Sequence, residues 1–270
     1  MEKRHWKGNL SKMSTQLDSP ILYQLRLGED MVNMTNAVGQ HVKVKYTGTI
    51  NCINCGRPTK KSFAQGFCYP CFMNAPQNAE CIIRPELCEA HLGKGRDPEW
   101  EERNHNQPHV VYLALSYGIK VGVTRATQVP FRWIDQGASK AIKIAVTENR
   151  YQAGMIEVAL KAFASDKTPW QRMLKNEVAT NVDLIESKDL LIDKLDQQWM
   201  EFATDDDEIT EMVYPAIRFP QLVKSHNLDK KAVLEGKLEA IKGQYLIFEG
   251  GKVMNVRKYG GYLVELEIES

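Results

Sequence analysis

The sequence has no apolar run long enough to cross a membrane, and its start, Met1 to Trp6, leads into no segment of the kind that a secretory signal needs. These absences predict a cytoplasmic protein that has no membrane partner and whose six cysteines stay reduced. Net charge is almost absent too, because 35 basic residues face 34 acidic ones and the formal charge is +1. The sequence therefore excludes a global polycation.

Acidic residues are missing from two stretches, although the chain as a whole is balanced. Between Gln40 and Ala79 there are five basic residues and no acidic one, and a second acid-free stretch, which includes Arg125, runs from Val111 to Ile134. Such basic stretches are compatible with phosphate binding, although solvated surfaces without a ligand carry them as well. At 270 residues and 43% hydrophobic composition, the chain can bury a core and form two or three modules.

Four of the six cysteines stand in two CxxC pairs, Cys52 with Cys55 and Cys68 with Cys71. Each pair can bring two sulfurs to one ion across a tight turn, so the four thiolates suit a tetrahedral Zn²⁺ site. Turn residues flank both pairs and predict a zinc ribbon with two knuckles. Four cysteine ligands leave no open position for water or substrate, so the expected zinc is structural. Four unliganded cysteines are the alternative.

Basic and aromatic residues accompany this motif. Lys60 and Lys61 lie between the two pairs, and Tyr69 lies within the second pair. Aromatic stacking beside phosphate contacts is what single-stranded nucleic acid requires, so these three residues are candidate nucleic-acid contacts, together with Arg125. The alternative, that the aromatic residues form the ribbon's own small core, is favoured for Phe67 and Phe72.

A second, looser set of metal ligands follows downstream. Cys81, Cys88 and His91 could bind a second zinc with a further histidine, and His105 suits this role better than His109, which adjoins a predicted strand. The spacing is irregular. Buried free cysteines and surface histidines are the alternative interpretation.

The middle of the chain predicts a β-hairpin over residues 110 to 124 and a short helix after Pro130. A strand at 141 to 146 and a helix from 150 to 164 follow. On that helix the predicted apolar stripe consists of Met155, Val158, Ala159 and Phe163.

Within this pattern, Tyr112, the string Lys120-Val121-Gly122-x-Thr124, Arg132 and Glu157 resemble the GIY-YIG nuclease domain over residues 109 to 175. In that family a tyrosine, an arginine and a glutamate surround one divalent metal. The resemblance implies that Tyr112 is a general base, Arg132 a phosphate clamp and Glu157 a ligand of Mg²⁺ or Mn²⁺. Active relatives usually have tyrosine where this chain has Lys120, which could lower the pKa of the phenol or bind phosphate.

Four strings carry a wider resemblance: CGRPTKKSF (55–63), GIKVGVTR (118–125), RWIDQGA (132–138) and IKGQYLI (241–247). By these strings the chain is similar to an uncharacterised bacterial zinc-ribbon family, domain of unknown function 2797. The resemblance implies no activity. Members of that family often have cysteine where this chain has Gly95 and His105.

Both ends of the chain predict β structure, over residues 8 to 50 and 232 to 268, and the two segments are expected to complete one sheet or a small barrel. Residues 183 to 202 predict one amphipathic helix, with Leu184, Leu191, Leu195 and Trp199 along one stripe. The acidic run 205–208 predicts a solvated loop, with metal binding as the alternative.

The sequence as a whole predicts an α+β protein. The expected segments are an N-terminal β segment (1–50), a zinc-ribbon region (51–108), a GIY-YIG-like core (109–180), a helical connection (181–212) and a C-terminal β segment (213–270). The expected function is nucleic-acid binding, with DNA or RNA left open and nuclease activity at the core an open question. The alternatives are a non-catalytic binding module and a zinc-built scaffold for a protein partner.

Overall fold

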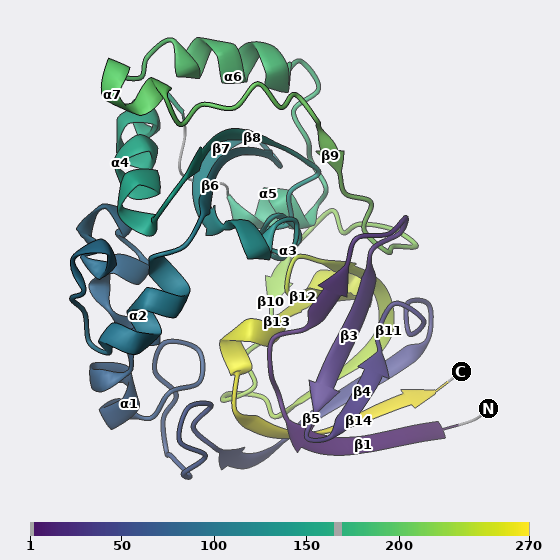
Figure 1. Ribbon diagram of the computed structural model, residues 1–270. Coiled ribbons are helices and arrows are strands. Elements are labelled where there is room, and N and C mark those ends of the chain that lie inside the picture. The colour runs from purple at the N-terminus through teal and green to yellow at the C-terminus, as the bar shows by residue number, and fades with distance from the viewer. Residues whose placement is uncertain (1–2, 165–168, 270) are drawn as a thin grey trace. The chain divides into compact units, whose positions relative to one another are not determined.

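The computed structural model describes residues 3–164 and 169–269, and its internal contacts divide the chain into two compact units (Figure 1). Unit 1 comprises Met1–Met73, Ile134–Gly137 and Met212–Ser270, and unit 2 comprises Asn74–Trp133 and Ala138–Glu211. Both units contain strands, and unit 2 contains most of the helical residues, so the predicted α+β class is confirmed.

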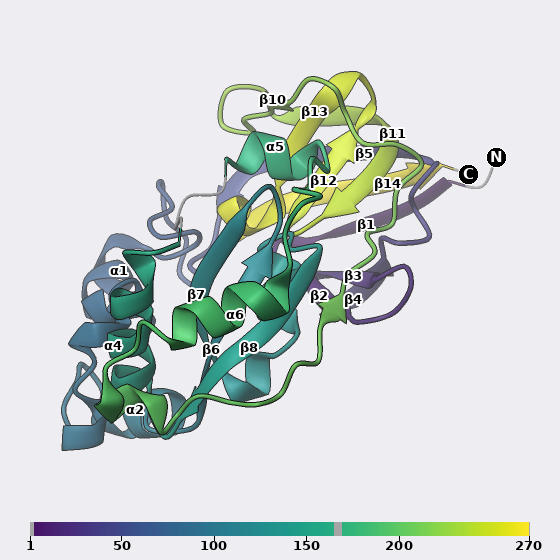
Figure 2. The same cartoon turned by 90° about the horizontal axis from the view of Figure 1, so that it is seen from above.

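Unit 1 contains a seven-stranded sheet with the order β1-β14-β5-β11-β12-β13-β10. Its strands are β1 (Lys3–Asn9), β14 (Tyr262–Glu269), β5 (His41–Ile50), β11 (Val233–Lys242), β12 (Tyr245–Phe248), β13 (Lys252–Asn255) and β10 (Lys224–Ser225). β14 lies between β1 and β5 and is antiparallel to both, so N-terminal and C-terminal segments share one sheet as expected (Figure 2).

Alternation of side chains explains why these segments form strands. In β5, Val42 and Val44 are buried while His41 and Lys45 are exposed, which is the period-2 pattern of a half-buried strand. A second, three-stranded sheet of unit 1 has the order β2-β3-β4 and shows the same alternation in its middle strand. Its strands are β2 (Ser14–Gln16), β3 (Leu22–Leu27) and β4 (Asp30–Asn33).

Unit 2 is built on a four-stranded sheet with the order β7-β6-β8-β9. The strands are β6 (His109–Leu115), β7 (Ile119–Arg125), β8 (Lys140–Thr147) and β9 (Thr210–Glu211). Every residue of β6 is buried, as its continuous apolar run predicts for a central strand. The predicted hairpin is confirmed as β6 and β7, and the predicted strand that follows is confirmed as β8.

Helices are short throughout the described part of the chain. The α-helices are α1 (Tyr69–Asn74), α2 (Pro98–His105), α3 (Phe131–Asp135), α4 (Arg150–Lys161), α5 (Trp170–Leu174), α6 (Leu184–Ile192) and α7 (Gln197–Met200). The 3₁₀ turns are η1 (Pro76–Asn78), η2 (Glu80–Ile82), η3 (Pro85–Leu87), η4 (Ala90–Leu92), η5 (Ala126–Gln128), η6 (Glu249–Gly251) and η7 (Val256–Tyr259). Among the residues described, no helix has the length and apolar character needed to span a bilayer.

The predicted apolar stripe of α4 is wrong at two of its four positions, although the helix is present and Ala159 packs against the core of unit 2. Val158 is exposed, and Phe163 lies beyond the helix end with 58% of its surface exposed. The buried positions are Ala153, Gly154, Ile156, Glu157 and Leu160. The reason is that α4 packs against the turn η3 as well as the sheet, and a Cβ on Gly154 would collide with the backbone at Pro85 and Glu86.

The predicted helix over 183 to 202 is two helices. Asp196 lies between α6 and α7 with an extended backbone (φ −61°, ψ 148°), and aspartate is favoured at such a position before a helix rather than inside one. Leu184, Leu191 and Leu195 are nevertheless buried in the core of unit 2, as predicted.

The acidic run is not simply solvated. Asp206 forms an ion pair with Lys143 (2.8 Å), and Asp207 forms one with Lys188 (2.7 Å), whose side chain is only 2% exposed. The buried Lys188 ammonium needs a counter-charge, which Asp207 supplies. The acidic loop therefore holds α6 against the rest of unit 2.

Candidate metal centres

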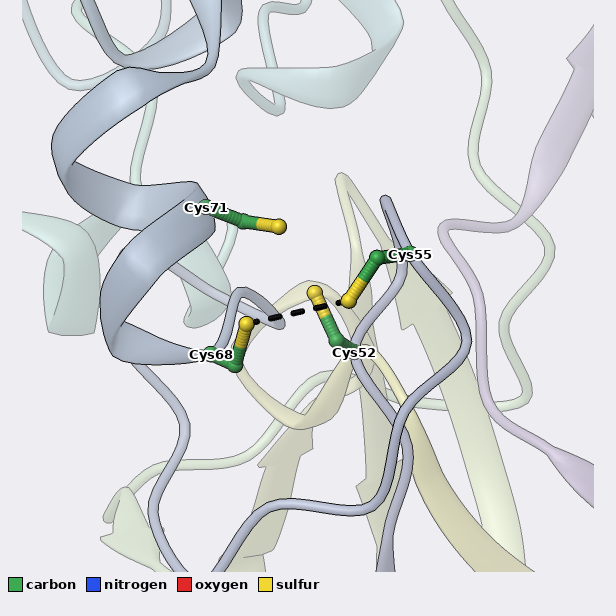
Figure 3. Close-up of side chains that lie close together, drawn as sticks. All are labelled: Cys52, Cys55, Cys68 and Cys71. Carbon is green, nitrogen blue, oxygen red and sulfur yellow. Dashed lines mark hydrogen bonds between the residues drawn. The ribbon is translucent and has the colours of Figure 1, made fainter.

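The cysteines of the two CxxC pairs come together in unit 1 (Figure 3). The four sulfur atoms lie within 4.8 Å of one another, and the Cys55 and Cys68 sulfurs are 3.8 Å apart. Sulfurs about 2.3 Å from one tetrahedral ion lie about 3.8 Å from each other. Cys52, Cys55, Cys68 and Cys71 are therefore placed so that they could hold a structural metal ion.

Tight turns place these sulfurs. After β5, the amide of Cys52 donates to the Arg57 carbonyl (2.8 Å), and the amide of Gly56 donates back to the Cys52 carbonyl (2.8 Å). Gly56 has a φ of +71°, the left-handed region that glycine adopts without strain. The second pair follows a reverse turn in which Phe63 and Phe67 pair; Cys68 directly precedes α1, and Cys71 lies within α1.

The turns also favour the thiolate at Cys52. Burial raises the pKa of this thiol, but the backbone N–H groups of Cys68, Cys55 and Asn54 point at the sulfur and together lower the pKa to about 6. The Asn54 side-chain amide donates a hydrogen bond to the Cys71 sulfur (3.4 Å). Donors aimed at sulfur stabilise the deprotonated ligand that metals require.

An aromatic and basic cluster lies beside the four cysteines. The Phe63 ring contacts the edge of Tyr69 (5.5 Å between centroids), stacks with Phe72 (5.7 Å) and carries the Lys61 ammonium over its face (5.2 Å). Tyr69 is 57% exposed, whereas Phe67 is buried. We call Lys60, Lys61, Phe63, Tyr69 and Phe72 the knuckle face, of which Phe63 and Phe72 were not among the predicted contacts.

The surface formed by the basic stretch carries less net positive charge than the sequence between Gln40 and Ala79 suggests. Lys43 and Lys45 on β5 form ion pairs with Glu267 (3.7 Å) and Glu265 (2.9 Å) of β14. The exposed Lys60 and Lys61 remain on the knuckle face. Partners from the far end of the chain therefore neutralise the part of the basic stretch that lies in the sheet.

A second cluster lies in unit 2. The structure brings Cys81, Cys88, Glu101 and His105 together, with one ligand atom of each within 4.8 Å of the others, and all four residues are buried. A hydrogen bond from the Cys81 thiol lowers the pKa of Cys88, burial opposes this, and the His105 side chain also lowers it, so that the pKa of Cys88 is about 4. His91, the predicted ligand, is outside this group, because it is exposed and its ring stacks on Tyr151 (4.8 Å).

Glu101 is the residue that sequence reasoning missed. It precedes His105 by one helical turn on α2, which begins after Asp97 accepts a hydrogen bond from the Trp100 amide (3.0 Å). Recognising Asp97-Pro98 as a helix start would have placed both side chains on one face.

His109 stays apart from this cluster. It is fully buried in β6, and its Nδ1 lies 2.7 Å from the Gln107 carbonyl oxygen. Burial lowers the pKa of His109 to about 3, so the ring is neutral at ordinary pH.

The residues that resemble a nuclease site are spread over β6, β7, α3 and α4. Tyr112 is 0% exposed, packs against Trp133 (5.8 Å) and lies over Gly122, where a Cβ would be 2.6 Å from the phenol oxygen. Lys120 is on β7 and Arg132 is on α3, and both are half-buried. The tyrosine is thus a packed residue of the sheet.

Glu157 on α4 is 8% exposed and forms an ion pair with Lys161 (3.3 Å). Burial raises the pKa of Glu157, and the positive charges of Lys161, Arg150 and Lys120 oppose the rise. Arg132 lies within electrostatic range of Arg150. Glu157 is therefore within electrostatic range of Lys120 and Arg150, and the sequence had not indicated Arg150.

Arg125, the other predicted phosphate contact, has a partner within unit 2. Its guanidinium donates to the Asn104 side-chain oxygen (2.7 Å), and burial lowers its pKa. This contact holds the end of β7 near α2.

Comparison with protein families gives one description, "protein of unknown function (DUF2797)", which matches residues 39–264. The chain belongs to this family. The DUF2797 match spans both cysteine clusters and the β6–β7 hairpin. Neither the curated proteins nor the solved structures give a match. Since the DUF2797 description names no activity, a function has to be argued from the residues.

Proposed function

We propose that this DUF2797 chain binds single-stranded nucleic acid at the knuckle face, next to a structural zinc held by Cys52, Cys55, Cys68 and Cys71. The observation that carries the proposal is the exposed Tyr69 ring beside Phe63, with the Lys61 ammonium over the Phe63 face. An exposed aromatic ring can stack on a base, and a neighbouring lysine can contact the phosphate of the same nucleotide.

Zinc would contribute structure and no chemistry at this site. Four thiolate ligands fill a tetrahedral ion, so the metal has no position for water or substrate. Its role would be to hold both knuckles rigid, because Tyr69 lies between the ligands Cys68 and Cys71 and owes its position to them. A fixed ring loses less conformational entropy when it stacks on a base.

The test is binding of labelled single-stranded RNA and DNA at several salt concentrations. We expect the double variant Lys60→Ala/Lys61→Ala to bind more weakly and to reduce the slope of log affinity against log salt by about 2. The matched control is Lys230→Ala/Lys231→Ala, which removes an exposed lysine pair elsewhere in unit 1. An equal slope in wild type and the first variant would place the interface elsewhere.

The stacking contact is tested separately at Tyr69. Tyr69→Ala should weaken binding by about 1–3 kcal/mol, the amount that one stacked base contributes, while Tyr69→Phe should keep most of the affinity. Loss of binding in both variants would show that the hydroxyl is needed and would contradict a contact made by stacking alone. Absence of any salt-sensitive binding in wild type would favour the protein-scaffold alternative.

Cleavage is a second candidate function, favoured by the carboxylate of Glu157 among the cations Lys120 and Arg150. A GIY-YIG-like site would use Glu157 to hold Mg²⁺ or Mn²⁺ and Arg132 to bind the phosphate. The buried Tyr112 speaks against its role as a base, because a base needs a route to the attacking water.

The cleavage candidate predicts that Glu157→Gln abolishes hydrolysis of labelled nucleic acid with Mg²⁺ or Mn²⁺ and leaves affinity unchanged. Glu148→Gln, an exposed carboxylate just before α4, is the control. Cleavage that persists in Glu157→Gln would contradict Glu157 as the metal ligand, and absence of cleavage in wild type would leave binding as the function.

A further inference from the structure

The second cluster differs from the first in its ligand types. We propose that Cys81, Cys88, Glu101 and His105 form a second structural zinc site, in which Glu101 supplies a carboxylate ligand. Two thiolates, an imidazole and a carboxylate together form a donor set that suits zinc, which accepts sulfur, nitrogen and oxygen in one tetrahedral site. The proposal does not depend on nucleic-acid binding.

The ligand atoms are already crowded around one point. The Cys81 sulfur lies 3.9 Å from Nδ1 of His105, and Nδ1 in turn lies against Oε2 of Glu101. Both carboxylate oxygens of Glu101 are buried, and the contact of Oε2 with Nδ1 of His105 is the one ion pair of this carboxylate within the described residues. Oε1 is buried with no hydrogen bond there, and a buried polar atom of this kind requires an explanation, which a shared metal ion supplies.

Charge balance is consistent with a divalent ion at this point. With both cysteines deprotonated as metal ligands, two thiolates and a carboxylate would carry three negative charges, which a buried site cannot hold without compensation. Arg150 lies within electrostatic range of Cys81, Cys88 and Glu101 and supplies one positive charge. A divalent cation supplies the other two, so the filled site together with Arg150 is neutral.

Arg150 is held in place for this role. It donates from Nε to the Cys81 carbonyl (3.0 Å) and from Nη2 to the Ile82 carbonyl (2.9 Å). These bonds join the start of α4 to the turn that carries Cys81. The proposed metal therefore stabilises the segment against which α4 packs.

The loop before α2 is shaped around the Glu101 side chain. A Cβ on Gly95 would collide with Cγ of Glu101 and lie 2.8 Å from its Cδ and 3.0 Å from its Oε1. Gly95 therefore leaves space that the carboxylate occupies. On the same helix, the Trp100 ring packs edge-on to His105 (5.0 Å between centroids) and fixes the orientation of the imidazole.

The first test is metal analysis and X-ray absorption of the full-length wild-type protein purified with zinc. The proposal predicts two zinc ions per chain with an average of about three sulfur ligands each, because one site has four thiolates and the other has two. One zinc per chain, an average of four sulfurs, or no zinc would overturn the proposal. This measurement needs no variant and so does not depend on whether a variant folds.

The second test assigns the ligand. Glu101→Ala should lower the zinc affinity of one site at least about 10-fold, as removal of a direct ligand does, and the other site should be unchanged. His91→Ala, at the exposed histidine that spacing alone suggests, is the control and should bind both ions as wild type does. A Glu101→Ala protein that binds two ions with unchanged affinities would overturn the role of Glu101.

A third variant pair tests the shape of the loop. Gly95→Ala should displace the Glu101 side chain and lower zinc affinity at the same site. Gly95 has a φ of +150°, where any side chain is strained, so this variant tests the loop conformation and the space for Glu101 together. Gly93→Ala, at a φ of +69° and with no atom within 4 Å, is the control for an alanine elsewhere in the same loop. Equal loss of zinc in both variants would contradict the packing of Glu101 over Gly95.

Discussion

At the scale of single residues, surroundings decide what a side chain can do. Tyr69 and Tyr112 are both candidate functional tyrosines in the sequence, yet Tyr69 is largely exposed and Tyr112 is fully buried. The first is available to stack on a ligand, and the second fills the space above Gly122. Exposure of an aromatic side chain depends on the whole fold, so the sequence could nominate both residues but could not separate them.

His109 makes a prediction about acid stability. Its pKa is about 3 in the fold and about 6.5 in an unfolded chain, so between these values only the unfolded state takes up the proton. The stability that depends on a neutral His109 is therefore fully present above pH 6.5 and declines as the pH falls toward 3. The total loss is at most about 5 kcal/mol.

The measurement is urea unfolding of unit 2, followed by its tryptophan fluorescence, at pH values from 7.5 to 5. His109→Gln should be less dependent on pH than wild type, because the titrating group is gone. If the free energy of unfolding changed with pH by the same amount in both proteins, the low pKa of His109 would be contradicted. The comparison cancels the contribution of the metal ligands, since both proteins contain them.

At the scale of elements, local signals predict what is local. The CxxC pairs, the hairpin of β6 and β7 and the alternation of β5 are each encoded within a few residues, and the structure contains all three. The buried face of α4 is different, because part of its surroundings is the backbone of η3, more than sixty residues earlier in the chain. The spacing of apolar residues along α4 cannot show that Gly154 packs against the backbone of a distant segment.

The packing of α4 on η3 predicts an unusual response to alanine. In an exposed helix, Gly→Ala is worth about 1 kcal/mol of added stability. Gly154→Ala should instead destabilise unit 2 by about 2–4 kcal/mol, because the new methyl group collides with the backbone at Pro85 and Glu86. Thermal unfolding compared with Val158→Ala, at an exposed position of the same helix, measures the difference.

The basic stretch of unit 1 is a second case in which distant residues decide what the sequence alone cannot predict. Five basic residues and no acidic one stand between Gln40 and Ala79, yet Glu265 and Glu267 of β14 pair with the two that lie in β5. These partners are more than two hundred residues away. A count of charge along the chain therefore overestimates the basic surface in unit 1.

At the scale of the whole molecule, each unit contains, within its described residues, one cluster of side chains that could hold a metal ion. We therefore expect metal removal by a chelator to lower the unfolding temperatures of both units, because ligands that bind only the folded state stabilise it. Cys68→Ser should lower the temperature for unit 1 and leave that of unit 2 near the wild-type value.

Hydrogen exchange during heating, read by mass spectrometry, can follow the two units separately. Peptides from β5 and β14 report on unit 1, and peptides from β6 and α4 report on unit 2. Equal shifts of both sets in Cys68→Ser would show that the units unfold as one body. No shift after chelation would show that the clusters hold no stabilising metal.

The pairing of β1 with β14 also determines the order in which the newly made chain can fold. Lys3 pairs with Glu269, and both neighbours of β5 lie beyond residue 232. Residues 74–211 leave the ribosome earlier, so unit 2 can close on itself while the first strands of unit 1 still wait for their partners. Translation that stops before residue 233 would release a chain with unpaired strand edges, the kind that associate with other chains and aggregate.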